Sequence, residues 1–421
     1  MGKYIINGQN KLHGEVFTSG AKNAVLPILA STVLNGGVCI LKNVPMLLDT
    51  FVAIDILKDL GCHVSIEKNT VIVDSKNITK TNVCEDLVKK MRCSIIFLGG
   101  LLARFKKSSI CYPGGCNLGK RPIDFHLKAF EQMGIKIEDD NNLIKATYEK
   151  IKNTTITLPF ASVGATQNII LASVFAEDKV VIKNCAKEPE IIDMVIFLKK
   201  MGANIKGEGT DTITITGVKK LNNVVEHTIM SDRIEAGTFL CMAAITNGNV
   251  KVNNINPSYL KPLTDVLEAT GCTIKTGNDF IKIKGTKNKK SIDFLQTNPY
   301  PAFPTDLQPQ LVSYLATVNG TSVVRENVFE ARNKHITELN KLGTNIIEQD
   351  GNFIINGVDS LQGSTVFSND LRGGACLICA GLFAKGKTIV EGACYINRGY
   401  ENIEKKLTLL GANIKYEKLN F

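Results

Sequence analysis

The sequence lacks the features that would place the protein in a membrane or in an oxidising compartment. Its longest apolar runs, NIILASVFA and CLICAGLFA, are too short to span a membrane, and its first residues, MGKYIINGQN, contain no apolar signal region. Most of its 12 cysteines occur singly; Cys376 and Cys379 form one CxxC pair inside the apolar stretch CLICA, and no Cys/His spacing is suited to zinc. These absences predict a cytoplasmic protein whose cysteines are mostly small buried side chains.

The chain also has few prolines and no concentration of charge. With 12 prolines and 44% hydrophobic residues among 421, it can bury a large core, and its length predicts two domains. The net charge of +10 comes from lysines spread along the whole chain rather than gathered in a patch. This charge is compatible with nucleic acid binding and equally with a solvated surface that attracts small anions.

One short phrase, of which LGANIKYEKLNF at the C-terminus is an example, occurs six times. Its glycines are spaced by 73, 68, 69, 72 and 68 residues, at Gly61, Gly134, Gly202, Gly271, Gly343 and Gly411. Such a regular period indicates six copies of one structural unit.

Each copy combines helical and strand patterns. Before each glycine, apolar residues recur three and four positions apart, as in residues 189–202, so the glycine is expected to cap a helix. After it the period changes to two around a polar turn, which predicts a β-hairpin. A second helix, apolar on all faces, opens each unit and leads into a strand, and such a helix is expected in the interior.

The predicted unit is therefore helix, strand, helix, strand, strand, and the predicted fold class is α/β. We expect three units in each of two lobes, with inner helices sheathed by sheets and outer helices. If the inner helices of a lobe run parallel, their N-termini gather on one face. We expect the two lobes to meet at these faces, because clefts between lobes are favoured binding places.

Polar residues stand at the starts of the apolar helices. Capping accounts for three of them, Ser162, Thr305 and Asp370. It does not account for four cations, which oppose the positive end of their own helix: Lys22, Arg92, Arg233 and Arg372. Because free N–H groups and cations at helix starts both favour anions, these residues predict an anionic ligand.

The stretch CYPGGCNLGKRPIDFH, residues 111–126, predicts a glycine-rich basic loop. Cys116 lies at its centre, close to Lys120 and Arg121, and cations lower the pKa of a thiol. Two interpretations stay open: an acid or nucleophile, and a surface cysteine without a role.

Three further residues also carry two interpretations. Asp306, in NPYPAFPTDLQPQ, suits either a helix cap or a base that accepts a proton from a substrate hydroxyl. Arg332 and Arg398 follow strands and, taken alone, are expected to be solvated side chains rather than ligand contacts.

Ten separated motifs, taken together, resemble one family. In order they are GAKNAVLP, MRCS, PGGCNLGKRPIDFH, SVGAT, EPEI, DRIEAGTF, PAFPTDLQ, FEARNKH, DLRGGA and NRGYENIEKKL. The sequence resembles the UDP-N-acetylglucosamine 1-carboxyvinyltransferases, a family of enolpyruvyl transferases, over its full length.

This resemblance implies a two-lobed inside-out α/β barrel with three repeats per lobe. It implies one lobe over residues 21–229, with the cysteine loop, and another over 1–20 and 230–421. The implied reaction transfers enolpyruvate from phosphoenolpyruvate to the 3-hydroxyl of UDP-N-acetylglucosamine and releases phosphate, as the first committed step of peptidoglycan synthesis.

The resemblance also implies roles for individual residues. Cys116 would protonate phosphoenolpyruvate and form an adduct with it, and Asp306 would take the proton of the sugar hydroxyl. The implied catalytic residues are Cys116, Lys22, Asp306 and Arg398. The implied substrate-binding residues are Lys22, Asn23, Arg92, Arg121, Pro122, Ile123, Asp124, Phe125, Ser162, Val163, Gly164, Thr305, Asp306, Val328, Arg332 and Arg372. No cofactor, metal, nucleic acid or membrane partner is implied.

Three positions depart from the family pattern. Phe160 stands where a basic residue is common, Asn397 where aspartate is usual, and Ala331 where asparagine is usual. These differences are expected to weaken local pairing rather than the catalytic set.

Two alternatives compete with this interpretation. The first is a 5-enolpyruvylshikimate-3-phosphate synthase, which shares the fold and the donor but should lack the PGGC loop. The second is a six-repeat nucleic-acid clamp without enzymatic activity, in which the cations would be spread over helix faces. Here they stand at helix starts and in loops, which favours the transferase.

Overall fold

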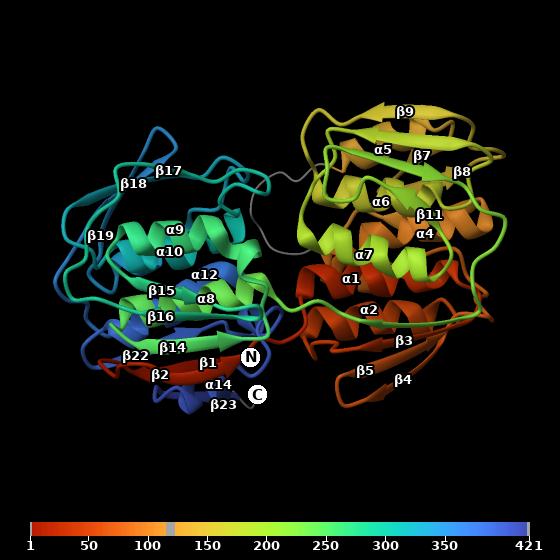
Figure 1. Ribbon diagram of the computed structural model, residues 1–421. Helices are drawn as coiled ribbons and strands as arrows, with labels where there is room; N and C mark the ends of the chain where they lie inside the picture. Colours follow the sequence, from red (N-terminus) through yellow and green to blue (C-terminus); the bar gives the residue numbers. More distant parts are fainter. Residues whose placement is uncertain (1, 115–122, 419–421) are drawn as a thin grey trace. The chain divides into compact units, whose positions relative to one another are not determined.

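A computed structural model describes residues 2–114 and 123–418, which divide into two compact units. The first unit comprises residues 20–114 and 123–230, and the second comprises residues 2–19 and 231–418. Each unit has its own hydrophobic core. Figure 1 shows helices within both units and strands on their outer sides.

The first unit is built from three repeats. Its inner helices are α1 (Lys22–Ser31), α4 (Ile96–Phe105) and α6 (Val163–Ser173), and its outer helices are α2 (Leu48–Asp59), α5 (Asp124–Gln132) and α7 (Pro189–Lys200). Short helices α3 (Glu85–Lys90), η1 (Thr32–Leu34) and η2 (Arg92–Ile95) complete it. Its strands are β3 (Val38–Lys42), β4 (His63–Glu67), β5 (Thr70–Asp74), β6 (Lys107–Cys111), β7 (Lys136–Asp140), β8 (Leu143–Thr147), β9 (Thr154–Thr157), β10 (Lys179–Lys183), β11 (Asn204–Lys206), β12 (Thr212–Thr216) and β13 (Val224–Thr228).

The second unit repeats this plan. Its inner helices are α8 (Arg233–Ile245), α10 (Gln308–Leu315) and α12 (Leu371–Phe383), and its outer helices are α9 (Lys261–Ala269), α11 (Lys334–Asn340) and α14 (Ile403–Leu409). It also holds η3 (Pro257–Leu260), η4 (Thr305–Leu307) and α13 (Ala393–Ile396). Its strands are β1 (Gly2–Asn7), β2 (His13–Phe17), β14 (Asn249–Asn253), β15 (Thr273–Thr276), β16 (Phe280–Lys284), β17 (Leu295–Gln296), β18 (Thr321–Arg325), β19 (Asn345–Gln349), β20 (Asn352–Asn356), β21 (Thr365–Phe367), β22 (Lys387–Glu391) and β23 (Asn413–Lys418).

The six glycines that end the outer helices confirm the predicted caps. Their φ angles are 103°, 82°, 101°, 99°, 92° and 91° at Gly61, Gly134, Gly202, Gly271, Gly343 and Gly411. Glycine adopts this left-handed conformation without the steric penalty of a Cβ atom. The chain can therefore leave each helix directly into a hairpin.

The predicted repeat omitted one strand. Of the six sheets formed by the described residues, five contain an extra edge strand parallel to the strand that follows the inner helix, as β9 is to β10 and β17 to β18. The five predicted elements occur in order, as in α1, β3, α2, β4 and β5, and the extra edge strand adds to them. Strand β17, with two residues, and β21, with three, carry too little alternation to be recognised.

The sixth repeat is completed by the start of the chain. Strand β1 lies between β22 and β23 and pairs antiparallel with both, so that Tyr4 lies opposite Val390 on one side and Tyr416 on the other. The C-terminal repeat therefore borrows one strand of its hairpin from the N-terminus.

The inner helices are buried, as their composition predicted. Every residue of α8 is buried, and α8, α10 and α12 pack against one another. Lys289 lies where these helices end: its Nζ atom donates to the carbonyl of Ile245 (3.3 Å) and to Thr317 Oγ1 (3.0 Å), and lies 5.1 Å from the Phe383 ring centre. A cation at helix C-termini is stabilised by the negative ends of the helix dipoles.

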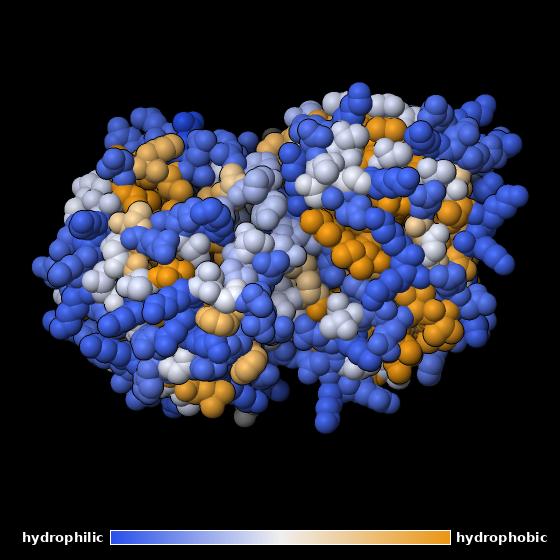
Figure 2. All heavy atoms as spheres, viewed as in Figure 1, coloured by the Kyte–Doolittle hydropathy of each residue, from blue (hydrophilic) through white to orange (hydrophobic). Residues whose placement is uncertain are grey.

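The surfaces of both units are mainly hydrophilic on the face drawn in Figure 2. Within residues 2–114 and 123–418, no helix has both the length and the apolar character needed to cross a membrane. Most cysteines of these residues are buried thiols, and Cys394 is exposed.

Candidate active site

Lys22 opens helix α1 of the first unit and is paired with a carboxylate. Its Nζ atom lies 3.0 Å from Oδ2 of Asp49, in the first turn of α2, and the two side chains are 14% and 4% exposed. A nearly buried carboxylate therefore offsets part of the conflict between this cation and its own helix.

A buried hydrogen-bond network fixes the tautomer of His126 on α5. Oδ1 of Asn168 accepts from the N–H of Gly99 (2.8 Å), so the Asn168 amide group donates to the carbonyl of Ile95 (3.0 Å) and to Nδ1 of His126 (3.0 Å). Because Nδ1 accepts, the proton of the neutral ring is on Nε2. Burial, with a smaller effect of the Arg92 charge, lowers the pKa of His126 to about 4.

This imidazole faces the start of α6. A Cβ atom added to Gly164 would lie 3.3 Å from both Cε1 and Nε2 of His126. Ser162 caps the same helix, because its side chain accepts from the N–H of Ala165 (3.4 Å), as predicted. The start of α6 therefore gathers backbone N–H groups and a neutral imidazole N–H, which are donors suited to an anion.

The second unit holds a three-residue charge cluster. Asp306 Oδ1 accepts from Nη1 of Arg332 (2.9 Å), and Oδ2 accepts from Nη2 (2.9 Å) and Nε (3.2 Å) of Arg372. The arginines are 4% and 2% exposed, and the Asp306 side chain is 22% exposed. The cluster carries one net positive charge in a poorly solvated place, which favours a second anion.

The pKa of Asp306 reflects two opposing effects. Burial would raise it, but the charges of Arg372 and Arg332 outweigh burial and hold the pKa well below the ordinary value of 3.8. Asp306 is therefore ionised at neutral pH. It can accept a proton there, but only from a group that has become strongly acidic.

Thr305 does not cap its helix, and this prediction was wrong. Pro304 stands at the N-cap of η4, whereas the Thr305 hydroxyl donates to Oε1 of Glu326 (2.9 Å). The same hydroxyl accepts from Nη1 of Arg332 (2.8 Å). Asp370, in contrast, caps α12 as predicted, because its Oδ1 atom accepts from the N–H groups of Arg372 and Gly373.

The structure distributes the predicted site residues over both units. The first unit places them at the starts of α1, η2, α5 and α6: Lys22, Asn23, Arg92, Ile123, Asp124, Phe125, Ser162, Val163 and Gly164. The second unit places them around η4, after β18, at the start of α12 and after α13: Thr305, Asp306, Val328, Arg332, Arg372 and Arg398. Three predicted residues, Cys116, Arg121 and Pro122, lie outside the described residues.

The structure shows the environment of two of the three residues that depart from the family pattern. Asn397 accepts a hydrogen bond from the Tyr4 hydroxyl through its Oδ1 atom (2.5 Å), so the amide has a partner on β1. Phe160 is 38% exposed, close to the start of α6.

Sequence reasoning missed Asp49, Glu326 and His126. Asp49 opens a predicted outer helix, where no site was expected; Glu326 belongs to no predicted helix start, and His126 ends the basic loop motif of residues 111–126. Their spacing from Lys22, Thr305 and Asn168 follows no local period, so only the fold brings these pairs together.

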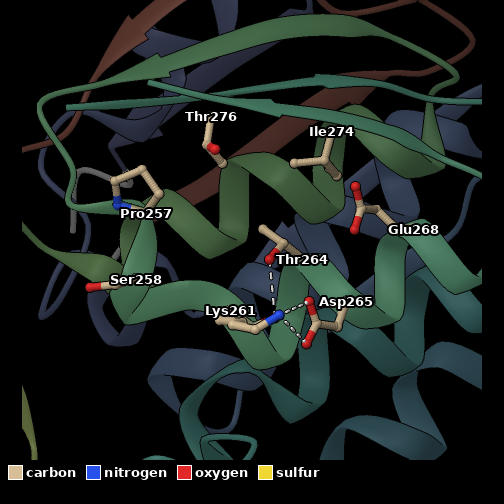
Figure 3. A pocket seen from close by; sticks show the side chains of 8 residues that line it. All are labelled: Pro257, Ser258, Lys261, Thr264, Asp265, Glu268, Ile274 and Thr276. Carbon is tan, nitrogen blue, oxygen red and sulfur yellow. Dashed lines mark hydrogen bonds and ion pairs between the residues drawn. The ribbon is translucent and has the colours of Figure 1, made fainter. Parts of the chain in front are cut away.

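The surface pocket drawn in Figure 3 contains none of the predicted site residues. Its volume is about 340 Å³, and it is lined by Pro257, Ser258, Lys261, Thr264, Asp265, Glu268, Ile274 and Thr276. Among the residues that the structure describes, no group of three or more His, Cys, Asp or Glu side chains could hold a metal ion.

The fold and its sequence match the enolpyruvyl transferases. The family model described as EPSP synthase (3-phosphoshikimate 1-carboxyvinyltransferase) matches residues 6–407. The enolpyruvyl transferase NikO from Streptomyces tendae shares the fold, with a TM-score of 0.89 and 23% identity over 100% of this chain and 99% of that one. EPSP synthase from Acinetobacter baumannii has a TM-score of 0.77 at 20% identity, over 99% and 100% of the two chains. The predicted inside-out α/β class is confirmed, and the chain is an enolpyruvyl transferase.

Curated relatives define the family within this class. UDP-N-acetylglucosamine 1-carboxyvinyltransferase 2 of Caldanaerobacter subterraneus subsp. tengcongensis is 48% identical over 98% of this chain and 99% of its own length. The enzyme of the same name from Clostridium tetani is 46% identical over 98% and 99%, and UDP-N-acetylglucosamine 1-carboxyvinyltransferase of Thermotoga maritima is 44% identical over 100% of both. The chain belongs to the UDP-N-acetylglucosamine 1-carboxyvinyltransferase family.

Proposed function

We propose that this chain transfers the enolpyruvyl group of phosphoenolpyruvate to the 3-hydroxyl of UDP-N-acetylglucosamine and releases inorganic phosphate. The observation that carries this proposal is the 48% identity over nearly the whole chain with a relative named for this transfer. The proposal places the reaction in the cytoplasm, at the first committed step of peptidoglycan synthesis.

The chemistry is addition followed by elimination. In the addition, the methylene carbon of phosphoenolpyruvate gains a proton, and the sugar oxygen bonds to the neighbouring carbon while the hydroxyl loses its proton. In the elimination, a proton leaves the new methyl group and the C–O bond to phosphate breaks. We assign the first proton to the Cys116 thiol, which can deliver it as a general acid.

We assign to Asp306 the role of the base that accepts the proton of the sugar hydroxyl. A carboxylate with such a low pKa is too weak a base to deprotonate a free alcohol. The hydroxyl becomes strongly acidic only as its oxygen bonds to carbon, so transfer to Asp306 has to accompany bond formation. The arginine pair thus keeps Asp306 ionised and delays its action until the addition is under way.

Cations and helix starts supply the anion binding that both substrates need. We assign Lys22, Arg121 and Arg398 to the binding of phosphoenolpyruvate. We propose that four further residues line the site around the reacting groups: Asn23, Arg92, Arg332 and Arg372. We assign the nucleotide and diphosphate to residues 121–125 and 162–164, where helix α6 offers free N–H groups.

Val328 is assigned to the sugar nucleotide through its backbone, and the structure limits which atom can act. The N–H of Val328 already donates to Oε1 of Glu326 (2.9 Å). A substrate group that contacts this residue is therefore expected to donate to its carbonyl oxygen.

The test is release of phosphate in the presence of both substrates, with each substrate alone as a control. Shikimate 3-phosphate in place of the sugar nucleotide distinguishes the rival transferase. We expect release only with UDP-N-acetylglucosamine, and loss of activity in Cys116→Ser or after alkylation by fosfomycin. Release with shikimate 3-phosphate alone as acceptor, or unchanged turnover in Cys116→Ser, would contradict the proposal.

A further inference from the structure

Glu326 is the first residue after strand β18, and one of its oxygens organises the following loop. Oε1 accepts three hydrogen bonds: from the N–H groups of Val328 (2.9 Å) and Phe329 (3.1 Å), and from the Thr305 hydroxyl (2.9 Å). The carboxylate thus joins the 326–332 loop to the turn that carries Asp306.

The hydrogen bonds around Thr305 have a fixed direction. A guanidinium group can only donate, so Nη1 of Arg332 donates to the Thr305 hydroxyl (2.8 Å). The single hydroxyl proton is then free to donate to Glu326 (2.9 Å). The order Arg332 to Thr305 to Glu326 is the arrangement that satisfies all three groups.

This order determines where Arg332 points. Nη1 carries two hydrogens: one goes to Thr305 and the other to Oδ1 of Asp306 (2.9 Å). The guanidinium group also lies 4.7 Å from the ring centre of Phe329, whose backbone N–H is held by Glu326. Glu326 therefore controls both groups, hydroxyl and ring, that hold the guanidinium in place.

We propose that Glu326 is a positioning residue for the transfer reaction: through Thr305 and Phe329 it holds Arg332 against Asp306 and so sets the orientation of the catalytic carboxylate. This inference rests on the proposed function for its kinetic consequence. It assigns Glu326 no contact with substrate, and the group that acts remains Asp306.

A role confined to stabilising the loop makes a different prediction. If Glu326 only held the loop N–H groups, its removal would lower the melting temperature and leave the titration of Asp306 unchanged. If it positions Arg332, its removal weakens the pairing of Arg332 with Asp306, and the pKa of Asp306 rises toward its ordinary value.

The experiment compares Glu326→Ala, Glu326→Gln and Thr305→Val. In Glu326→Ala we expect kcat to fall about 10- to 100-fold, because loss of orientation costs this much, while KM for phosphoenolpyruvate changes less than about 3-fold. The acid limb of kcat against pH should move to higher pH. Glu326→Gln, whose carbonyl can accept all three hydrogen bonds, should restore most of kcat.

Thr305→Val removes the hydroxyl and leaves Glu326 bonded to the loop N–H groups. We expect it to move the acid limb in the same direction as Glu326→Ala. This variant keeps the test decisive if Glu326→Ala fails to fold, which circular dichroism would show.

A titration without substrates separates this inference from the proposed function. Asp306 is followed by carbon-13 NMR of aspartate-labelled protein, with Asp306→Asn used to assign the signal. We expect a higher pKa of Asp306 in Glu326→Ala and in Thr305→Val than in the wild type. An unchanged pKa in both variants would overturn the inference, whereas absence of turnover in the wild type would count only against the proposed function.

Discussion

The guanidinium group of Arg372 donates two hydrogen bonds to one carboxylate oxygen of Asp306: Nη2 and Nε of the arginine lie 2.9 Å and 3.2 Å from Oδ2. Arg372 stands in the first turn of α12, and Asp306 lies in η4, which leads into α10. Two inner helices of one unit are therefore joined at their starts by a charge pair.

This pair predicts the effect of Asp306→Asn on stability. Removal of one partner leaves the buried guanidinium groups of Arg372 and Arg332 without their carboxylate, so we expect a loss of about 3 kcal/mol in free energy of unfolding at pH 7. The folded pKa of Asp306 is depressed, so its contribution is present above the ordinary value of 3.8 and is lost as pH falls toward the folded pKa. Denaturation by urea at pH 7 and at pH 3 measures both effects, and equal differences at the two pH values would contradict this account.

A second prediction concerns the tautomer of His126. Nitrogen-15 NMR should show a neutral ring protonated on Nε2 at pH 7, with protonation of Nδ1 only near pH 4. Asn168→Asp offers Nδ1 a carboxylate acceptor in place of a donor, so the proton should move to Nδ1 and the pKa should rise. An Nδ1–H tautomer in the wild type would show that the Asn168 amide is oriented the other way.

The buried ammonium of Lys289 predicts a rise of stability with pH. Burial lowers its pKa from 10.5 to about 8, so between these values the unfolded chain binds more protons than the folded one. The contribution is roughly 3 kcal/mol, gained as pH rises from 8 to 10.5. Lys289→Met should lack this rise, and the difference between the two unfolding curves isolates it from other titrations. A constant difference across this range would contradict the assigned pKa.

The repeated caps predict the cost of replacing one glycine. Gly343 has a φ of 92°, and a Cβ atom placed there would meet nothing within 4 Å, so only backbone strain opposes a side chain. Gly343→Ala should cost about 1 kcal/mol, and Gly343→Asn less, because asparagine tolerates this conformation better. Thermal denaturation of both variants measures the order, and equal melting temperatures of wild type and Gly343→Ala would count against the cap.

The repeats and the helix caps could be predicted from sequence because they depend on local patterns. The six glycines and the change of period after them are visible within a dozen residues. Strand β17, with two residues, could not be found in this way, because its pairing with β18 rather than its own composition defines it. Likewise, no local pattern in β1 indicates that it completes the last repeat.

The sequence predicted which residue types stand at the helix starts, but not which side chains they contact. The cations at helix starts were interpreted as signs of a ligand, yet Lys22 and Arg372 lie against Asp49 and Asp306 within their own units. Thr305 was assigned to capping because threonine is common at helix starts, and its contact with Glu326 depends on a loop 21 positions further on. Such contacts follow from tertiary structure, which single-sequence patterns do not contain.

The place of β1 has a consequence for synthesis on the ribosome. The first unit, residues 20–114 and 123–230, is translated before most of the second, so it can acquire its structure while translation continues. Tyr4, in contrast, has to wait for Val390 and Tyr416 to be translated. The first-made segment of the polypeptide is therefore among the last to find its partners, and until then its apolar side chains depend on chaperones or on transient contacts for protection.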